Sequence, residues 1–215
     1  MTGAPNSLRD GLPPLPAHMA NLPVDGKGFP VPFFVAWIDG KPDFRLADPD
    51  KMTTAVRFNR CWICGQPLGK YLAFVSGPMC TINRASAEPP SHLDCATFAA
   101  TTCPFLVLPK AVRRDAKLPE ERADPAGVFV KHNPGVCAIW ITKDYGVRRV
   151  DDGVLFNMGE PSEVLWYTQG RRASRAEVMT AIEAGLPLLR EIAQAEGTSA
   201  QLEQAIDVVV SNLLP

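Results

Sequence analysis

Four side chains in the middle of the sequence have the types and spacing of metal ligands. Cys61 and Cys64 form a C-x-x-C pair followed by Gly65, the spacing of a zinc knuckle, whose tight turn directs two thiolates at one ion. His92 and Cys95 are three residues apart, so they share one face of a helix that begins there. Three thiolates and one imidazole form a closed tetrahedral set. The sequence therefore predicts a structural Zn²⁺ site made of these four residues.

The remaining cysteines leave alternatives open. Five of the six cysteines fall within residues 61–103, a clustering that favours metal binding over disulfides in a reducing compartment. Cys80 can replace one ligand or pack as a buried thiol near the site, and Cys103 and Cys137 are expected in the core. Two alternatives remain for the whole cluster: the cysteines are buried free thiols, or they bind an iron–sulfur cluster.

The segments between the ligand pairs predict how the ligands are positioned. Residues 70–75 and 79–83 have the composition of two strands joined by a turn, and Ser91 is expected to cap the helix that carries His92 and Cys95. A knuckle, a hairpin and a helix with the last two ligands resemble a treble-clef zinc finger over about residues 57–103. The resemblance implies a structural zinc ion.

The rest of the chain predicts an α+β protein in which this treble-clef-like module is embedded with an antiparallel sheet and C-terminal helices. The expected units are a flexible or surface-draped arm (1–27), a β-hairpin and short helix (28–56), the zinc module (57–109), a charged linker (110–125), an antiparallel β region (126–170) and C-terminal helices (171–215). Within the β region, strands are expected over residues 127–130, 136–141, 154–156 and 164–168.

Residues 171–215 carry the clearest helix signals. Ser174 and Glu177 form a capping box, and Val178, Ile182, Leu186 and Leu189 follow at helical spacing. Pro187 is expected to kink or split this helix. Thr198 or Ser199 then caps a final amphipathic helix.

Composition limits the compartment and the partners. The chain of 215 residues has a net charge of −1, no run of about 18 apolar residues and no basic start followed by an apolar stretch. These features predict a cytoplasmic protein with no membrane partner.

The zinc module differs in charge from the whole chain. Residues 51–87 contain no Asp or Glu and five basic residues, a pattern that suits phosphate backbones. An exposed Trp62 at the knuckle tip can stack on a base. The expected nucleic-acid contacts are Arg57, Arg60, Trp62, Lys70 and Arg84. The alternative is that the aromatic residues form the module's small core and the basic residues are only solvated.

The common catalytic motifs are absent from the sequence. The sequence has no P-loop, no G-x-G-x-x-G, no nucleophile elbow and no H-x-E deaminase signature. Many treble-clef proteins are HNH nucleases with a histidine on the hairpin, but residues 70–83 contain none, so nuclease activity requires His132 to reach the module. We therefore expect no enzymatic activity and keep an HNH-like metal-dependent endonuclease as an alternative.

Residues 32–45, 61–69, 77–84 and 88–95 together resemble a group of uncharacterised bacteriophage and prophage proteins, over most of residues 30–195. The resemblance implies an accessory protein acting in an infected bacterial cell. With the basic module, it predicts binding to nucleic acid or to a nucleic-acid-handling host protein. The alternative from another class is a protein-interaction inhibitor of a host enzyme that binds no nucleic acid.

Overall fold

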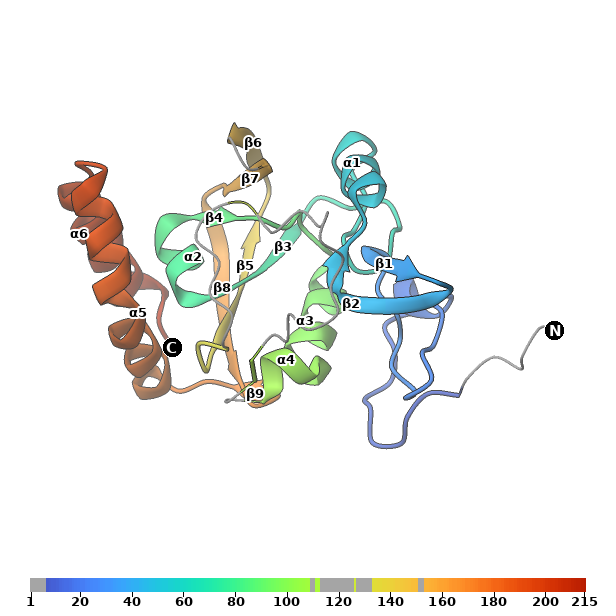
Figure 1. Ribbon diagram of the computed structural model, residues 1–215. Coiled ribbons are helices and arrows are strands. Elements are labelled where there is room, and N and C mark those ends of the chain that lie inside the picture. The colour runs from blue at the N-terminus through green and yellow to red at the C-terminus, as the bar shows by residue number, and fades with distance from the viewer. Residues whose placement is uncertain (1–6, 109–110, 113–125, 127–132, 151–152) are drawn as a thin grey trace.

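The computed structural model describes residues 7–108, 111–112, 126, 133–150 and 153–215. Within these residues the chain is a mixed α+β protein with antiparallel sheets and two C-terminal helices, as predicted (Figure 1).

The central sheet joins segments far apart in the sequence. It has the order β3 (Leu72–Ser76), β5 (Cys137–Thr142), β8 (Pro161–Thr168) and β9 (Arg171–Arg172), and all of its pairs are antiparallel. Every residue of β5 is buried, because helices or side chains cover both of its faces. Cys137, Ile139 and Ile141 point to one face, while Ala138 and Trp140 point to the other.

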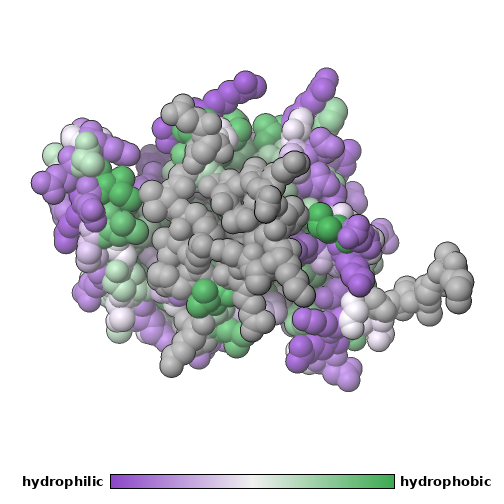
Figure 2. All heavy atoms as spheres, viewed as in Figure 1, coloured by the Kyte–Doolittle hydropathy of each residue, from purple (hydrophilic) through white to green (hydrophobic). Residues whose placement is uncertain are grey.

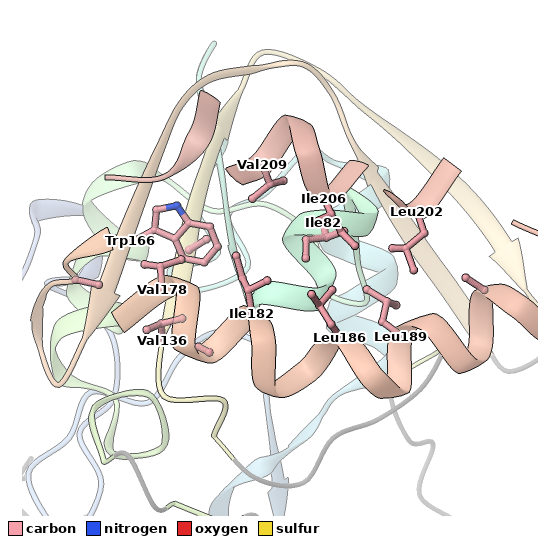
Figure 3. Packing of buried hydrophobic residues seen from close by; sticks show 14 residues of the cluster. Ile82, Val136, Trp166, Val178, Ile182, Leu186, Leu189, Leu202, Ile206 and Val209 are labelled. Atoms are coloured by element: carbon pink, nitrogen blue, oxygen red, sulfur yellow. The ribbon is translucent and has the colours of Figure 1, made fainter. Parts of the chain in front are cut away.

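Helices pack on the two faces of this sheet. On one face, Ala96 and Ala100 of α3 (Leu93–Thr102) belong to the same buried cluster as Ile139, and the short α4 (Pro104–Val107) follows. The other face carries α5 (Arg175–Ala195) and α6 (Ser199–Val208), which continues into the π-helical turn η2 (Val209–Leu213). Figure 3 shows Trp166 of β8 and the apolar side chains of α5 and α6 pointing into one shared core.

The predicted strand over residues 79–83 is wrong. These residues form helix α2 (Pro78–Asn83), which begins with Pro78 in its first turn and ends at Arg84 in the left-handed conformation. Met79 and Ile82 lie three residues apart and both pack against the core of the C-terminal helices. With no hairpin between the ligand pairs, a treble-clef fold is not confirmed.

Strand β3 takes a different partner from the expected one. It pairs with β5, from Leu72 opposite Thr142 to Ser76 opposite Ala138. Its other edge makes one bridge, in which Ala73 and Ser91 exchange backbone hydrogen bonds of 2.8 and 2.9 Å. The sheet therefore holds the segment directly before α3.

A second sheet has the order β4 (Ala85–Ser86), β7 (Gly153–Met158) and β6 (Tyr145–Val150). Strands over residues 136–141, 154–156 and 164–168 are confirmed by β5, β7 and β8. Strand β6 is not among the predicted strands, because its middle residues are all exposed and show no apolar alternation. The expected strand over 127–130 and most of the 110–125 linker lie outside the described residues.

The predicted hairpin and short helix near the N-terminus are confirmed. Strands β1 (Val35–Ile38) and β2 (Lys41–Ala47) are joined by Asp39 and Gly40, both with positive φ, as in a type I′ turn. Helix α1 (Pro49–Arg57) begins at Asp48, whose carboxylate accepts hydrogen bonds from two backbone N–H groups of the first turn.

The capping box of Ser174 and Glu177 is confirmed at the start of α5. The helix is not split at Pro187, because the apolar side chains on either side of it, Leu186 and Leu189, are both buried in the same core and hold the helix together. Hydrophilic side chains cover the outer face of α5 and α6 at the left edge of Figure 2. No helix among the described residues is both long and apolar enough to cross a lipid bilayer.

Candidate metal centre

The knuckle is a short ribbon closed by a tight turn. Arg60 bridges Pro67, and the backbone N–H of Cys61 donates to the carbonyl of Gln66 at 2.8 Å. Gly65 has a φ of +73°, and a Cβ there would lie 2.8 Å from the ring of Phe33. A glycine is therefore required at this turn for both its backbone conformation and its lack of a side chain.

The second ligand pair lies at the start of α3. His92 is the N-cap residue, and Cys95 is in the first turn. Ser91, the expected cap, is instead buried in the bridge to Ala73, and its side chain caps nothing. Pairing with β3 therefore sets the direction from which the chain enters α3.

The four ligand atoms converge. The Sγ atoms of Cys61, Cys64 and Cys95 and a ring nitrogen of His92 all lie within 4.8 Å of one another. His92 Nδ1 is 3.3 Å from Cys64 Sγ and 3.9 Å from Cys95 Sγ. Zn–S bonds of about 2.3 Å place tetrahedral sulfur atoms about 3.8 Å apart. The four residues are therefore placed to bind a metal ion, with a donor set and spacing compatible with zinc.

Backbone contacts orient the donors. The N–H groups of Cys64 and His92 each approach Cys61 Sγ at 3.4 Å. His92 Nε2 lies 2.9 Å from the carbonyl oxygen of Pro67, which only accepts hydrogen bonds. The proton therefore resides on Nε2, and the lone pair of Nδ1 points at the three sulfur atoms.

The three thiols are electrostatically coupled. Hydrogen bonds from the Cys64 and Cys95 side chains lower the pKa of Cys61 below its ordinary value. The contact with Cys61 raises the pKa of Cys64 to about 11 and also raises that of Cys95. A bound divalent cation removes this conflict, because it favours the thiolate form of all three.

The arm before the hairpin contributes to this region. The imidazole of His18 stacks on His92, with ring centroids 4.1 Å apart and planes 9° from parallel, and His18 Nε2 is 3.9 Å from Asp94. Met19, in the 3₁₀ turn η1 (Ala17–Met19), is 1% exposed and packs with Cys61 and Cys95. Residues 1–27 are predicted from sequence to be a flexible or surface-draped arm, and no role is predicted for His18. The only signal available was the apolar spacing of Leu15, Met19 and Leu22.

The other cysteines lie apart from the cluster. Cys80 is exposed on α2 and does not belong to the group of four, so the alternative in which it replaces a ligand is not supported. Cys137 is buried in β5, where burial raises its pKa to about 12, and Cys103 is half-buried. These two positions fit the expected packing role.

Trp62 is not an exposed stacking residue. Its side chain is 2% exposed and stacks on Phe34 at 5.0 Å, and its Nε1–H has no hydrogen-bond partner in the described part of the chain. The prediction was wrong because the segment before β1 covers the knuckle, and the indole fills the small core beneath it. The alternative reading, in which aromatic side chains form the module core, holds for this residue.

The expected basic contacts do not form one set. Arg84 is paired with Glu160 at 2.7 Å and lies on the wall of a cleft of about 420 Å³ that α6 completes. Arg60 donates to the carbonyl of Gly65 on the knuckle, and Arg57 and Lys70 flank the knuckle ribbon in sequence. The contacts of Arg84 therefore separate it from the knuckle, whereas Arg57, Arg60 and Lys70 remain near it.

Two histidines are relevant to the nuclease alternative. His132, the candidate general base, lies outside the described residues. His18 is near the metal ligands, but it stacks on one of them and forms no part of a hairpin.

Comparisons with known proteins found no matching family model, no matching curated protein and no matching solved structure. The assignment of the site therefore depends on the geometry of these residues alone.

Proposed function

We propose that this chain is a non-enzymatic zinc-binding protein in which a structural Zn²⁺ joins the knuckle to helix α3, and that it acts by binding a partner. The observation that carries the proposal is the convergence of the four ligand atoms within 4.8 Å, with all three cysteines buried. A closed Cys₃His set leaves no coordination position for a substrate, which favours a structural over a catalytic ion.

Metal analysis of the purified chain tests the zinc site. We expect about one zinc ion per chain, and loss of the ion in Cys64→Ser and His92→Ala. Cys80→Ser and Cys103→Ser are matched controls, because each removes a thiol outside the cluster and leaves the zinc content unchanged. Full zinc content in both ligand variants would contradict the assignment.

Nucleic acid is the partner that the charge distribution favours. Arg57, Arg60 and Lys70 lie near the knuckle, residues 51–87 contain no acid, and no ion pair is found for these three residues within the described ranges. Binding to phosphates through such residues weakens steeply as salt rises. The resemblance to phage and prophage proteins makes an accessory role in an infected bacterial cell part of this proposal.

A protein partner is the second candidate. Trp37, Ile38 and Phe44 of the β1–β2 hairpin are each more than 40% exposed, and exposed apolar side chains on one small element are typical of protein-interaction surfaces. An inhibitor of a host enzyme would use such a surface. A complex from host lysate that survives nuclease treatment and is lost in Trp37→Ala would favour this candidate over nucleic acid.

A further inference from the structure

The most exposed aromatic side chains near the metal centre lie among cations. Phe58 is 58% exposed and Tyr71 is 51% exposed. Arg57 lies 5.4 Å from the ring centroid of Phe58, and the Nζ atom of Lys70 lies 5.9 Å from that of Tyr71. Both aromatic residues therefore present a ring to solvent beside a positive charge.

Tyr71 receives a second cation from a distant part of the chain. Because Leu72 pairs with Thr142 in the central sheet, the next residues outward are Tyr71 and Lys143. Lys143 Nζ lies 5.8 Å from the Tyr71 ring centroid. The pairing of β3 with β5 thus places two lysines around one exposed ring.

The knuckle ribbon connects the chain segments that carry the two aromatic residues. Arg60 bridges Pro67, and the N–H of Leu68 donates to the carbonyl of Asn59 at 2.9 Å. Phe58 directly precedes one strand of this ribbon, and Tyr71 follows shortly after the other. The chain segments that carry Phe58 and Tyr71 therefore extend from the same end of the ribbon.

The charge of this surface is positive. It carries Arg57, Lys70 and Lys143, and the acid adjacent in sequence is Asp144. Glu160, which lies near Lys143, is already paired with Arg84 at 2.7 Å. Exposed rings beside cations that have no ion pair in the described part of the chain suit a ligand with flat bases and a charged backbone.

We infer that Phe58 and Tyr71, with Arg57, Lys70 and Lys143, form a binding site for single-stranded nucleic acid, in which unpaired bases stack on the two rings and the cations contact the phosphates. A single strand is specified because a duplex keeps its bases stacked on each other and offers no face to an aromatic side chain. This inference deepens the proposed binding function and replaces Trp62 with Tyr71 as the stacking residue.

Fluorescence anisotropy tests the site with the zinc-loaded full chain and a labelled oligothymidylate of about 15 nucleotides at about 50 mM salt. We expect Tyr71→Ala to weaken binding about 5- to 150-fold, since stacking of one base contributes about 1–3 kcal/mol. Tyr71→Phe keeps the ring and should bind as the wild type does. Leu188→Ala removes a comparably exposed apolar side chain on α5, outside both proposed surfaces, and is the matched control, expected to have no effect.

The salt dependence tests the cations separately. Lys143→Gln should lower the slope of log K against log salt by about 0.7, as expected for one phosphate contact on a single strand. Lys41→Gln, an exposed lysine on β2, should leave the slope unchanged. An oligouridylate of the same length distinguishes RNA from DNA, because only RNA offers a 2′-hydroxyl.

Three results would overturn the inference: no binding of either oligonucleotide at low salt, wild-type binding by Tyr71→Ala, or binding only to duplex. Zinc content is measured on the same samples. A chain that holds zinc but binds no oligonucleotide overturns this site alone, whereas a chain without zinc overturns the proposed function.

Discussion

The metal centre and the C-terminal half of the molecule differ in what fills their interiors. Around the metal centre the buried side chains are three cysteines with Met19, Ile63 and Phe98. The core beneath α5 and α6 contains 14 buried residues, and the Trp166 side chain at one end donates a hydrogen bond to the carbonyl of Leu213. We expect a region with so little apolar material to depend on the proposed metal ligation for its stability, whereas the C-terminal half gains its stability from apolar burial.

Metal removal is expected to produce the largest difference in stability between the two regions. Structural zinc contributes an apparent free energy of about 10 kcal/mol or more in small zinc modules, so a strong chelator should abolish the order of the knuckle. Hydrogen exchange should then be fast at Cys64 and Gly65, whose N–H groups bond to Cys61, and should stay slow at Ile182 in α5. Equal loss of protection in both places would show that the two regions unfold as one unit.

Truncation of the apolar core should destabilise the C-terminal half and leave the metal site intact. Trp166→Ala removes a fully buried indole and is expected to lower the free energy of unfolding by about 3–5 kcal/mol. Urea denaturation followed by circular dichroism measures this loss, and zinc content should remain at the wild-type level. Loss of zinc in the folded variant would mean that the C-terminal core also positions the ligands.

The smallest expected effect is that of titrating Glu177 in the capping box at the start of α5. Hydrogen bonds from Arg171 and from Ser174 lower the pKa of Glu177 from 4.5 to about 2. Because the folded chain favours the ionised form, the contribution of Glu177 is complete above about pH 4.5 and is lost as pH falls through about 2.

Exchange at the first amides of α5 tests this titration. Wild-type protection should exceed that of Glu177→Gln at about pH 5, and the difference should vanish near pH 2. High salt should reduce the difference, since the Glu177 side chain is 33% exposed to solvent and its partner Arg171 is 57% exposed. A difference that persists at the lowest pH would contradict a role for the carboxylate charge.

The ligand set could be predicted because its spacing is local. The turn after Cys61 and the helical start after His92 each prepare one pair of ligands, and both signals lie within a few residues. The capping box at Ser174 was predictable for the same reason. In each case the chemistry of neighbouring residues determines the local conformation.

The sheet pairings and the buried faces depended on distant contacts. Nothing in residues 70–75 specifies β5 as the partner, and 62 residues separate Ser76 from Ala138, with which it pairs. A short apolar run such as 79–83 suits a strand or a helix equally, and packing against α5 decided it. Trp62 was misplaced because its burial depends on Phe34, which the ligand spacing does not reveal.

The packing of Met19 against Cys95 has a consequence for the chain during its synthesis. Met19 is synthesised 76 residues before Cys95, so this packing partner does not yet exist when the arm is made. At about 5–20 residues per second, this interval lasts about 4–15 s. Cys64 is synthesised 31 residues before Cys95, so for about 2–6 s at the same rate Cys61 and Cys64 are free thiols without the second ligand pair of the proposed site.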